Sequence, residues 1–188
     1  MSIYLLLSHA HIRTASNQSE TLSLLKNKNE FSRKFIYNRK RELRLLQNDG
    51  ISIAIVSQFT PKQIAFFYIQ LFKKRWNKNP RALTYIEEQL IAMREFMAGY
   101  LLIKNNQAIA IQILFFSKSV NYLSVEFINA GIDPAFSHFS PGSTLTYLNT
   151  EWAAQHAKEN NLELRYSFGK TDEEYKTIWC KPTPVYFT

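Results

Sequence analysis

The chain has few of the residues that build disulfides, metal clusters and phosphate loops. Its 188 residues include one cysteine, five glycines and four histidines. The single cysteine, Cys180, excludes an internal disulfide and fits a reducing compartment. His9 and His11 are spaced for one face of a strand but have no further ligands beside them, so we expect no metal. A nucleophile triad and a phosphate-loop consensus are also missing from the sequence.

Long apolar runs are missing as well. The run Ile3–Leu7 is far shorter than the ~20 residues that a membrane-spanning helix needs. It also lacks the basic start and the small-residue cleavage site of a signal peptide. We therefore expect no transmembrane span and a cytoplasmic location.

The composition is that of a globular domain with an uneven charge. Hydrophobic residues make up 46% of the chain and charged residues 20%. Residues 1–81 hold 15 of the 23 basic residues and 4 of the 15 acidic ones, so the excess positive charge lies in this part. Such an excess favours a polyanionic partner, which is a nucleic acid, an anionic membrane or a phosphorylated donor. The alternative is that these charges are only solvated helix faces.

A basic amphipathic helix is predicted at Phe31–Gln47. The first 30 residues show no clear periodicity, and we treat them as a poorly defined segment before a single domain at 31–188. One broad side of the helix is apolar, with Phe31, Phe35, Ile36, Leu43, Leu45 and Leu46. The other side carries Tyr37 among the cations Arg33, Lys34, Lys40, Arg41 and Arg44.

The remaining pattern predicts an α/β (α+β) domain with a mixed sheet. A strand at Ile51–Val56 precedes a helix that begins at Thr60-Pro61 and a second helix at 81–98. Three strands then form an antiparallel meander, at Tyr100–Lys104, Ala108–Ser117 and Val120–Ile128, the last ended by Asn129-Ala130-Gly131. A helix from Ser140, a strand at Leu162–Phe168, a short helix and a strand at Val185–Phe187 complete the order.

These segments resemble the GNAT fold, and in particular its peptidoglycan-crosslinking (Fem-like) and cellulose-biosynthesis branch. That branch has an aromatic-Gly step before a Tyr-Lys-x-x-Trp helix, which Phe168-Gly169 and Tyr175–Trp179 match. The chain is also similar to the Mig (macrophage-inducible) family of bacterial antimicrobial-peptide resistance proteins over about residues 30–182. The similar positions are Asn129, Gly131, Asp133-Pro134, Ser140–Ser143, Tyr175-Lys176 and Trp179-Cys180.

The resemblance implies transfer of an acyl or aminoacyl group to an amine, from acyl-CoA or aminoacyl-tRNA. The Mig family is associated with the cytoplasmic face of the inner membrane and with survival against cationic peptides, and some members are described as transcriptional regulators. Its members are longer, so we expect this chain to be the C-terminal part of a longer architecture. An exposed sheet edge would then favour a homodimer.

The resemblance also implies a donor site at Ser140, Gly142, Ser143 and Thr144. In GNAT enzymes a Gly-rich loop at this place opens a helix, and its N–H groups bind the CoA pyrophosphate. The usual basic-x-x-Gly-x-Gly pattern is missing here, and an ordinary Ser-Pro helix cap is the alternative that we favour. Lys176 is a candidate for a phosphate contact.

Three side chains are candidates for proton transfer. Glu126 lies on a predicted strand, where it acts as a base or simply faces water. His138 follows Asp133, and the pair is either a base with its carboxylate or a turn aspartate and a loop histidine. Tyr175 donates a proton to the leaving group, as GNAT tyrosines do, or packs with Trp179 onto the sheet.

The basic helix is the strongest functional pattern in the sequence. Its five cations suit anionic lipid headgroups, and they suit the backbone of a tRNA-like donor equally well. Three hypotheses remain: a GNAT-like transferase, a non-catalytic module that binds membrane or a partner, and a nucleic-acid-binding regulator. The third lacks a helix-turn-helix signature and ranks last.

Overall fold

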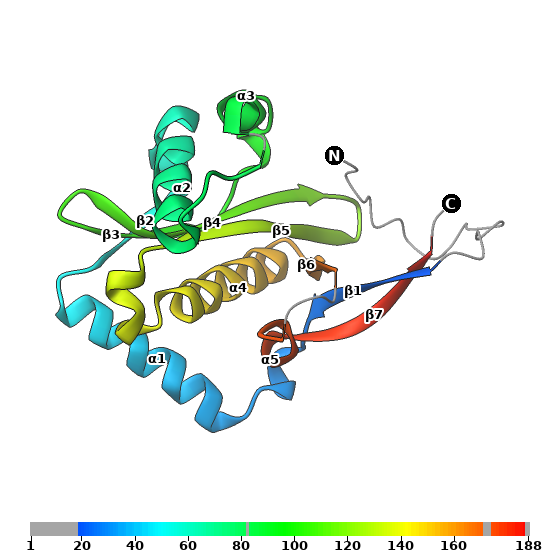
Figure 1. Cartoon of the computed structure of the whole chain (residues 1–188). Coiled ribbons are helices and arrows are strands. Elements are labelled where there is room, and N and C mark those ends of the chain that lie inside the picture. The colour runs from blue at the N-terminus through cyan, green and yellow to red at the C-terminus, as the bar shows by residue number, and fades with distance from the viewer. Residues whose placement is uncertain (1–18, 82, 171–173, 187–188) are drawn as a thin grey trace.

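A mixed sheet with helices on both faces forms the molecule (Figure 1). The structure is a computed structural model that describes residues 19–81, 83–170 and 174–186. Its strands are β1 (Ser19–Leu25), β2 (Ser52–Ile55), β3 (Tyr100–Lys104), β4 (Gln107–Lys118), β5 (Tyr122–Ile132), β6 (Glu163–Lys170) and β7 (Cys180–Tyr186). Its α-helices are α1 (Arg33–Asn48), α2 (Pro61–Trp76), α3 (Ile86–Ala92), α4 (Pro141–Glu159) and α5 (Lys176–Trp179). The strand order is β2–β3–β4–β5–β6–β1–β7, which confirms the predicted fold class.

The antiparallel meander is present and extends further than predicted. Asn105 and Asn106 both have positive φ, at 50° and 60°, as a tight β3–β4 hairpin requires. Strand β5 does not end at Asn129 but continues to Ile132. Its register against β4 shifts between Phe127 and Asn129, so Ile128 is a bulged residue inside the strand. The predicted strand end was therefore placed too early.

The other half of the sheet depends on a strand that the sequence did not reveal. β1, within the segment that showed no periodicity, lies between β6 and β7 and pairs with both. Leu22 and Ser23 on its two faces are both buried. Only Leu22 and Leu24 alternate with Ser23, and Leu25 breaks the pattern, so the period-2 signal is too short to stand out.

The helices divide between the two faces, with α2 and α3 above the sheet in Figure 1 and α1 and α4 below it. Thr60 caps α2 by accepting a hydrogen bond from the Gln63 N–H, and Gln63 accepts from the Thr60 N–H, as predicted. The helix predicted at 81–98 is shorter, because only α3 is α-helical, between the 3₁₀ turns η4 (Leu83–Tyr85) and η5 (Arg94–Phe96). Met97 pairs with Phe115 of β4, so the chain must be extended there.

Helix α1 starts at a Ser32 cap that accepts from the Phe35 N–H, and it is the most peripheral of the long helices. Only Leu46 on its apolar side is buried, and Leu45 is 43% exposed, which corrects the predicted position of Leu45. Phe31, Phe35 and Ile36 are half-buried against a cluster that includes Tyr147 of α4. Within the described residues, every helix is too short or too polar to cross a bilayer.

Candidate functional site

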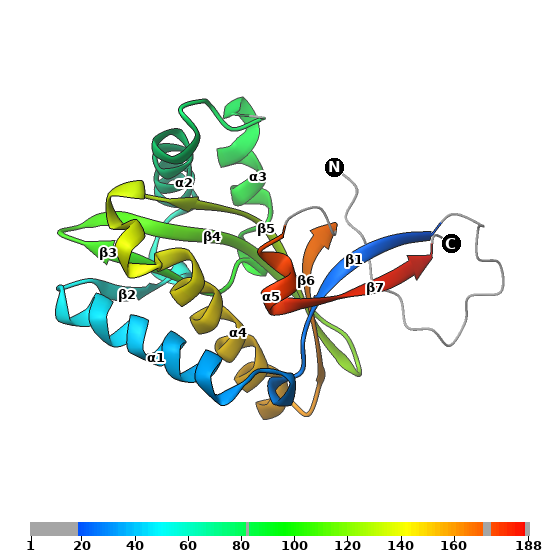
Figure 2. The same cartoon turned by 60° about the horizontal axis from the view of Figure 1, so that its bottom comes forward.

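Strands β5 and β6 pair side by side and then separate. Their parallel register runs from Tyr122 opposite Glu163 to Glu126 opposite Ser167. Beyond that point β5 stays paired with β4 up to Ile132, whereas β6 pairs with β1. Figure 2 shows β6 turning away from the line of β5 toward β1. The two strands therefore part at Glu126.

Glu126 is mostly buried at this point. It alternates with Val125 and Phe127, which pack toward α4, so its carboxylate lies on the opposite face of the sheet. The Ser167 hydroxyl donates a 2.9 Å hydrogen bond to Glu126 Oε1. Burial raises the pKa of Glu126 to about 7, and the Ser167 hydrogen bond opposes that rise. A carboxylate with a pKa near neutrality can accept and release protons under physiological conditions.

Tyr166 of β6 and Cys180 of β7 are buried among apolar side chains on the α4 side of the sheet. Burial raises the pKa of the Tyr166 hydroxyl, and that hydroxyl has no hydrogen-bond partner among the described residues. Burial also raises the pKa of Cys180 to about 12, against the opposing effect of Lys176. The Cys180 thiol is therefore protonated at neutral pH and is not a nucleophile.

At the α4 entrance, which we define as residues 140–144, some backbone N–H groups are already hydrogen-bonded within the chain and others are not. Ser140 has a φ of 53° and makes no side-chain cap, so the predicted Ser-Pro cap is wrong in its serine part. The Ser140 N–H donates to the Ser137 carbonyl, and the Thr144 N–H donates to the Ser140 carbonyl. Thr144 is also fully buried, so neither residue offers an N–H to an anion. Among the described residues, the N–H groups of Gly142 and Ser143 remain for such a role.

Gly142 has a packing role besides any binding role. A Cβ added there would lie 2.7 Å from Ile132 Cδ1, at the end of β5. The glycine therefore allows the first turn of α4 to approach the strand closely.

A buried polar network holds α4 against the sheet, and the sequence analysis did not find it. Asn149 accepts from the Tyr100 N–H at 2.7 Å and donates to Gln112 Oε1 at 2.8 Å. Gln112 in turn donates to the Thr146 hydroxyl. Asn149 is fully buried and Gln112 nearly so. Because each buried polar group has a partner, the network fixes the position of the α4 entrance.

The structure separates His138 from the groups that a base would need. Asp133 is buried and forms a 2.5 Å ion pair with Lys74 Nζ of α2, and it also accepts from the Ala135 N–H. His138 is exposed in the 3₁₀ segment η6 (Pro134–Phe139), against the Phe139 ring. Seven residues of extended chain separate Glu126 from Asp133, roughly 20 Å along the strand. The structure therefore supports the alternative of a turn aspartate and a loop histidine, and His138 does not lie beside Glu126.

Tyr175 and Lys176 lie at the start of α5 with different exposure. Tyr175 is 44% exposed. Lys176 is buried, and its Nζ donates to the Lys170 carbonyl at 2.7 Å. This contact fixes the chain after β6 and makes Lys176 unsuitable as an open phosphate ligand, contrary to the prediction.

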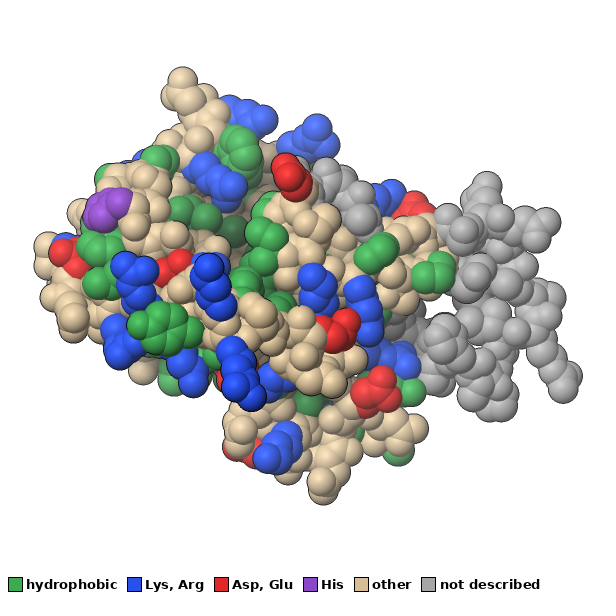
Figure 3. Space-filling model, turned by 90° about the horizontal axis from the view of Figure 1, so that it is seen from below, with side chains coloured by type: hydrophobic (Ala, Val, Ile, Leu, Met, Phe, Trp, Pro, Cys, Tyr) green, Lys and Arg blue, Asp and Glu red, His purple; other side chains and the backbone are tan. Residues whose placement is uncertain are grey.

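The predicted basic surface is present on α1. Arg33, Lys34, Lys40, Arg41 and Arg44 are all exposed, and none forms a salt bridge within the described part of the chain. Figure 3 shows Lys and Arg side chains gathered on this underside of the molecule, with hydrophobic side chains between them. Tyr37, 60% exposed, is on the same helix face.

The part of the chain that the structure describes holds no group of three or more His, Cys, Asp or Glu side chains suited to a metal ion. His9 and His11 lie outside the described residues.

Comparison with solved structures shows which known folds this chain resembles. FemX matches with a TM-score of 0.59 and 13% identity, over 87% of this chain and 59% of its own. The C-terminal domain of a protein assigned as a lysylphosphatidylglycerol synthetase from Agrobacterium fabrum matches with a TM-score of 0.55 and 13% identity, over 90% of this chain and 60% of its own. This chain thus spans about three fifths of each. The likeness confirms the GNAT-like fold predicted from the sequence.

The sequence comparisons identify a family. No curated protein matches the chain. The sequence model of the Mig-14 family matches residues 3–188, which is nearly the whole chain. The chain belongs to the Mig-14 family.

Proposed function

We propose that this chain is a GNAT-like domain that transfers an acyl or aminoacyl group to an amine, with Glu126 as the proton acceptor. The observation that carries the proposal is the position of Glu126, mostly buried where β5 and β6 part, with a pKa of about 7. Unpaired strand edges beyond this point can hydrogen-bond an extended donor arm. The GNAT-like fold supports the same chemistry by analogy.

The proposed reaction uses few groups. The amine nitrogen attacks the acyl carbon, and the bond from that carbon to the sulfur or oxygen of the donor breaks. The amine proton goes to the Glu126 carboxylate, and the leaving thiolate or alkoxide takes a proton from the hydroxyl of Tyr175, a residue that is 44% exposed. Ser167 orients the carboxylate through its hydrogen bond.

The Gly142 and Ser143 N–H groups would hold a phosphate of the donor at the start of α4. Their helix is 19 residues long, and its N-terminus favours an anion. Acyl-CoA and aminoacyl-tRNA both carry phosphates, so this contact does not choose between the two donors.

A donor screen followed by one substitution tests the transfer. Acetyl-CoA and aminoacyl-tRNA are first tested for a rise in melting temperature, and the binding donor is then assayed with amine acceptors. Glu126→Gln is expected to reduce turnover by about 10²- to 10⁴-fold with donor binding retained. Glu163→Gln, an exposed change on the same strand pair, is the control and should retain full turnover. Equal turnover in the Glu126→Gln variant would eliminate Glu126 as the base.

We propose a second role for α1, which is attachment to an anionic phospholipid surface. At 100° per residue, Arg33, Lys40 and Arg44 lie on one face of the helix, with Tyr37 among them. Leu45 at the edge of this face is 43% exposed. Cations around exposed apolar side chains are typical of helices that lie in a membrane interface, with about 1 kcal/mol for each cation. On family membership alone, we also propose a contribution to survival against cationic peptides.

Liposome flotation tests this attachment. Vesicles with phosphatidylglycerol are expected to carry the protein, and the Arg41→Glu/Arg44→Glu variant is expected to stay behind. The matched control is Lys73→Glu/Lys78→Glu, which reverses two exposed charges at the end of α2. Flotation that survives the α1 substitutions, or that both double variants lose equally, would remove α1 from this role. Loss of tRNA binding without loss of flotation would assign the helix to the donor instead.

A further inference from the structure

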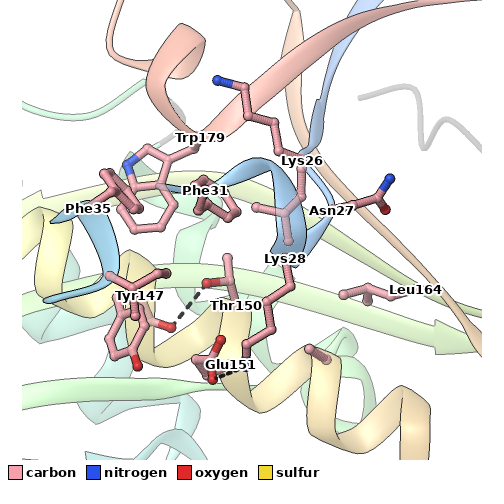
Figure 4. Close-up of a pocket in the computed structure, with 13 residues that line it drawn as sticks. Lys26, Asn27, Lys28, Phe31, Phe35, Tyr147, Thr150, Glu151, Leu164 and Trp179 are labelled. Atoms are coloured by element: carbon pink, nitrogen blue, oxygen red, sulfur yellow. Dashed lines mark hydrogen bonds and ion pairs between the residues drawn. The ribbon is translucent and has the colours of Figure 1, made fainter. Parts of the chain in front are cut away.

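A pocket lies beside α4 (Figure 4). It is on the face of the sheet that Val125 and Phe127 share, opposite to the face of Glu126. Its volume is about 130 Å³. One wall is the segment that joins β1 to α1, and the other is the middle of α4. Leu164 of β6 lines it between these walls. The pocket is therefore separate from the group proposed for proton transfer.

One end of the pocket is aromatic. The Phe31 and Phe35 rings stack with centroids 5.0 Å apart, and the Phe35 ring meets Trp179 edge to face, also at 5.0 Å. Leu25 and Ile36 extend this apolar lining. Aromatic faces attract cations as well as apolar groups, because the ring quadrupole is negative at its face.

The other end of the pocket is acidic. Glu151 of α4 lines it, and Lys28 reaches down from the opposite wall to pair with Glu151 Oε2 at 2.8 Å. The hydrogen bond with Glu151 raises the pKa of Lys28. The second Glu151 oxygen accepts no hydrogen bond from the described residues and is available to accept one. Lys26, the other lysine at the rim, points away from the pocket and donates to the Thr177 and Ile178 carbonyls.

We propose that this pocket binds a primary alkylammonium group, with the ammonium on Glu151 and the aliphatic stem among Phe31, Phe35 and Trp179. Lys28 already places an ammonium group on Glu151, which is the contact that the ligand would make at this end of the pocket. The side chain acts as an internal competitor that a ligand displaces.

Displacement of Lys28 requires little free energy. Its side chain is 72% exposed, and exposed ion pairs contribute little to stability.

The volume of the pocket limits the length of the aliphatic stem that it can hold. An engineered apolar cavity of about 150 Å³ binds benzene, so this pocket suits a stem of about six carbons.

Titration calorimetry with n-hexylamine, n-hexanol and hexanoate tests the proposal. We expect hexylamine to bind the wild-type protein, hexanol to bind more weakly, and hexanoate not to bind. Lys28→Ala should strengthen hexylamine binding, by up to about fivefold, because the competitor is gone. Glu151→Gln should weaken it by about tenfold or more, because a charged hydrogen bond is lost.

Glu159→Gln is the matched control, since Glu159 is an exposed glutamate further along α4 and does not line this pocket. It should bind hexylamine as the wild type does. Melting temperatures of all variants confirm that they fold. The proposal is overturned if hexylamine binds neither the wild type nor Lys28→Ala, if Glu151→Gln binds it equally well, or if hexanoate binds best.

Discussion

The two halves of the sheet are built from different kinds of contact. In the meander half, β2 to β5, each of β3, β4 and β5 pairs with the strand just before it in the chain. In the mixed half, β6, β1 and β7, the middle strand comes from the other end of the chain. Leu24 of β1 lies opposite Ser167 of β6, about 140 residues later in the sequence. The first half is specified by nearby residues, and the second forms only when distant segments meet.

The proposed proton acceptor lies on the boundary between these halves. Glu126 belongs to β5, and the Ser167 hydroxyl that holds it belongs to β6. Its environment therefore depends on the mixed half being in place. A change that loosens β1 and β6 should reach the site even when the meander stays folded.

The largest effect should come from the core of the mixed half. Leu22→Ala in β1 removes a side chain that is 3% exposed and should reduce the free energy of unfolding by about 2–5 kcal/mol. Leu102→Ala in β3 is the matched change in the meander half, because Leu102 is also a buried leucine in the core of a strand. Urea unfolding gives the size of each change. In Leu22→Ala, amide hydrogen exchange should become faster mainly in β6, β1 and β7. If exchange became faster by the same amount over the whole sheet in both variants, the two halves would unfold as one cooperative unit.

The proton acceptor at the boundary between the two halves can be tested by measuring the free energy of unfolding as a function of pH. Because the folded pKa of Glu126 is raised to about 7, the folded state holds a proton that the unfolded state releases near pH 4.5. Stability from this group is complete at low pH and is lost as the pH rises through about 7. Glu126→Gln should therefore be more stable than the wild type above neutral pH, by up to about 3 kcal/mol, and similar to it at low pH.

Chemical denaturation over a range of pH measures this difference. Ser167→Ala sharpens the result. Because the Ser167 hydrogen bond lowers the pKa of Glu126, its loss should raise that pKa and extend the decline in stability to higher pH. A pH-independent difference between Glu126→Gln and the wild type would show that the carboxyl group has an ordinary pKa.

In the meander, Gly99→Ala should cost about 1–3 kcal/mol of unfolding free energy. Gly99 has a φ of 92°, and an added Cβ would lie 2.6 Å from Asn149 Oδ1 and 2.9 Å from Leu114 Cδ1. Gly50→Ala is the control, because Gly50 has a φ of 77° but no atom within 4 Å of the added carbon. Thermal unfolding should show the smaller loss at Gly50. Equal losses would mean that the polar network around Asn149 adjusts without effect on stability.

The smallest effect distinguishes two helix starts. Thr60→Ala at α2 should cost about 1 kcal/mol, because the threonine hydroxyl accepts from the Gln63 N–H. Ser140→Ala at α4 should change stability by only a few tenths of a kcal/mol, because the serine side chain makes no cap. Parallel denaturation of the two variants measures the contrast, and a large loss at Ser140 would reveal a side-chain role for that serine.

The sequence predicted the meander and α2 because their signals are local. Asn105-Asn106 selects a tight hairpin, and Thr60 with Gln63 selects a helix start, whatever lies further away. β1 could not be predicted in this way, since its partners are far along the chain and its alternating pattern covers only Leu22–Leu24. The length of the helix near Ile86 was wrong for a related reason, which is the pairing of Met97 with β4.

The candidate site was likewise predicted only in part, because some of its residues give a local signal and others do not. Glu126 stood out because a carboxylate occurred on a strand between apolar residues. Its partner Ser167 and the Asn149–Gln112 network depend on contacts between strands and helices that no spacing reveals. The sequence left open whether Asp133 and His138 act as a pair, because spacing along the chain does not show that Lys74 from a distant helix holds that carboxylate.

The central place of β1 has a consequence for the newborn protein. Ribosomes add about 5–20 residues per second, so the roughly 140 residues between β1 and its first partner take on the order of ten seconds to make. During that time the segment emerges into the cell with its hydrogen-bonding groups unpaired. The meander can fold meanwhile, and the β5 edge then awaits β6 as a template for the remaining strands. Chaperone binding to nascent chains should therefore concentrate on this early segment.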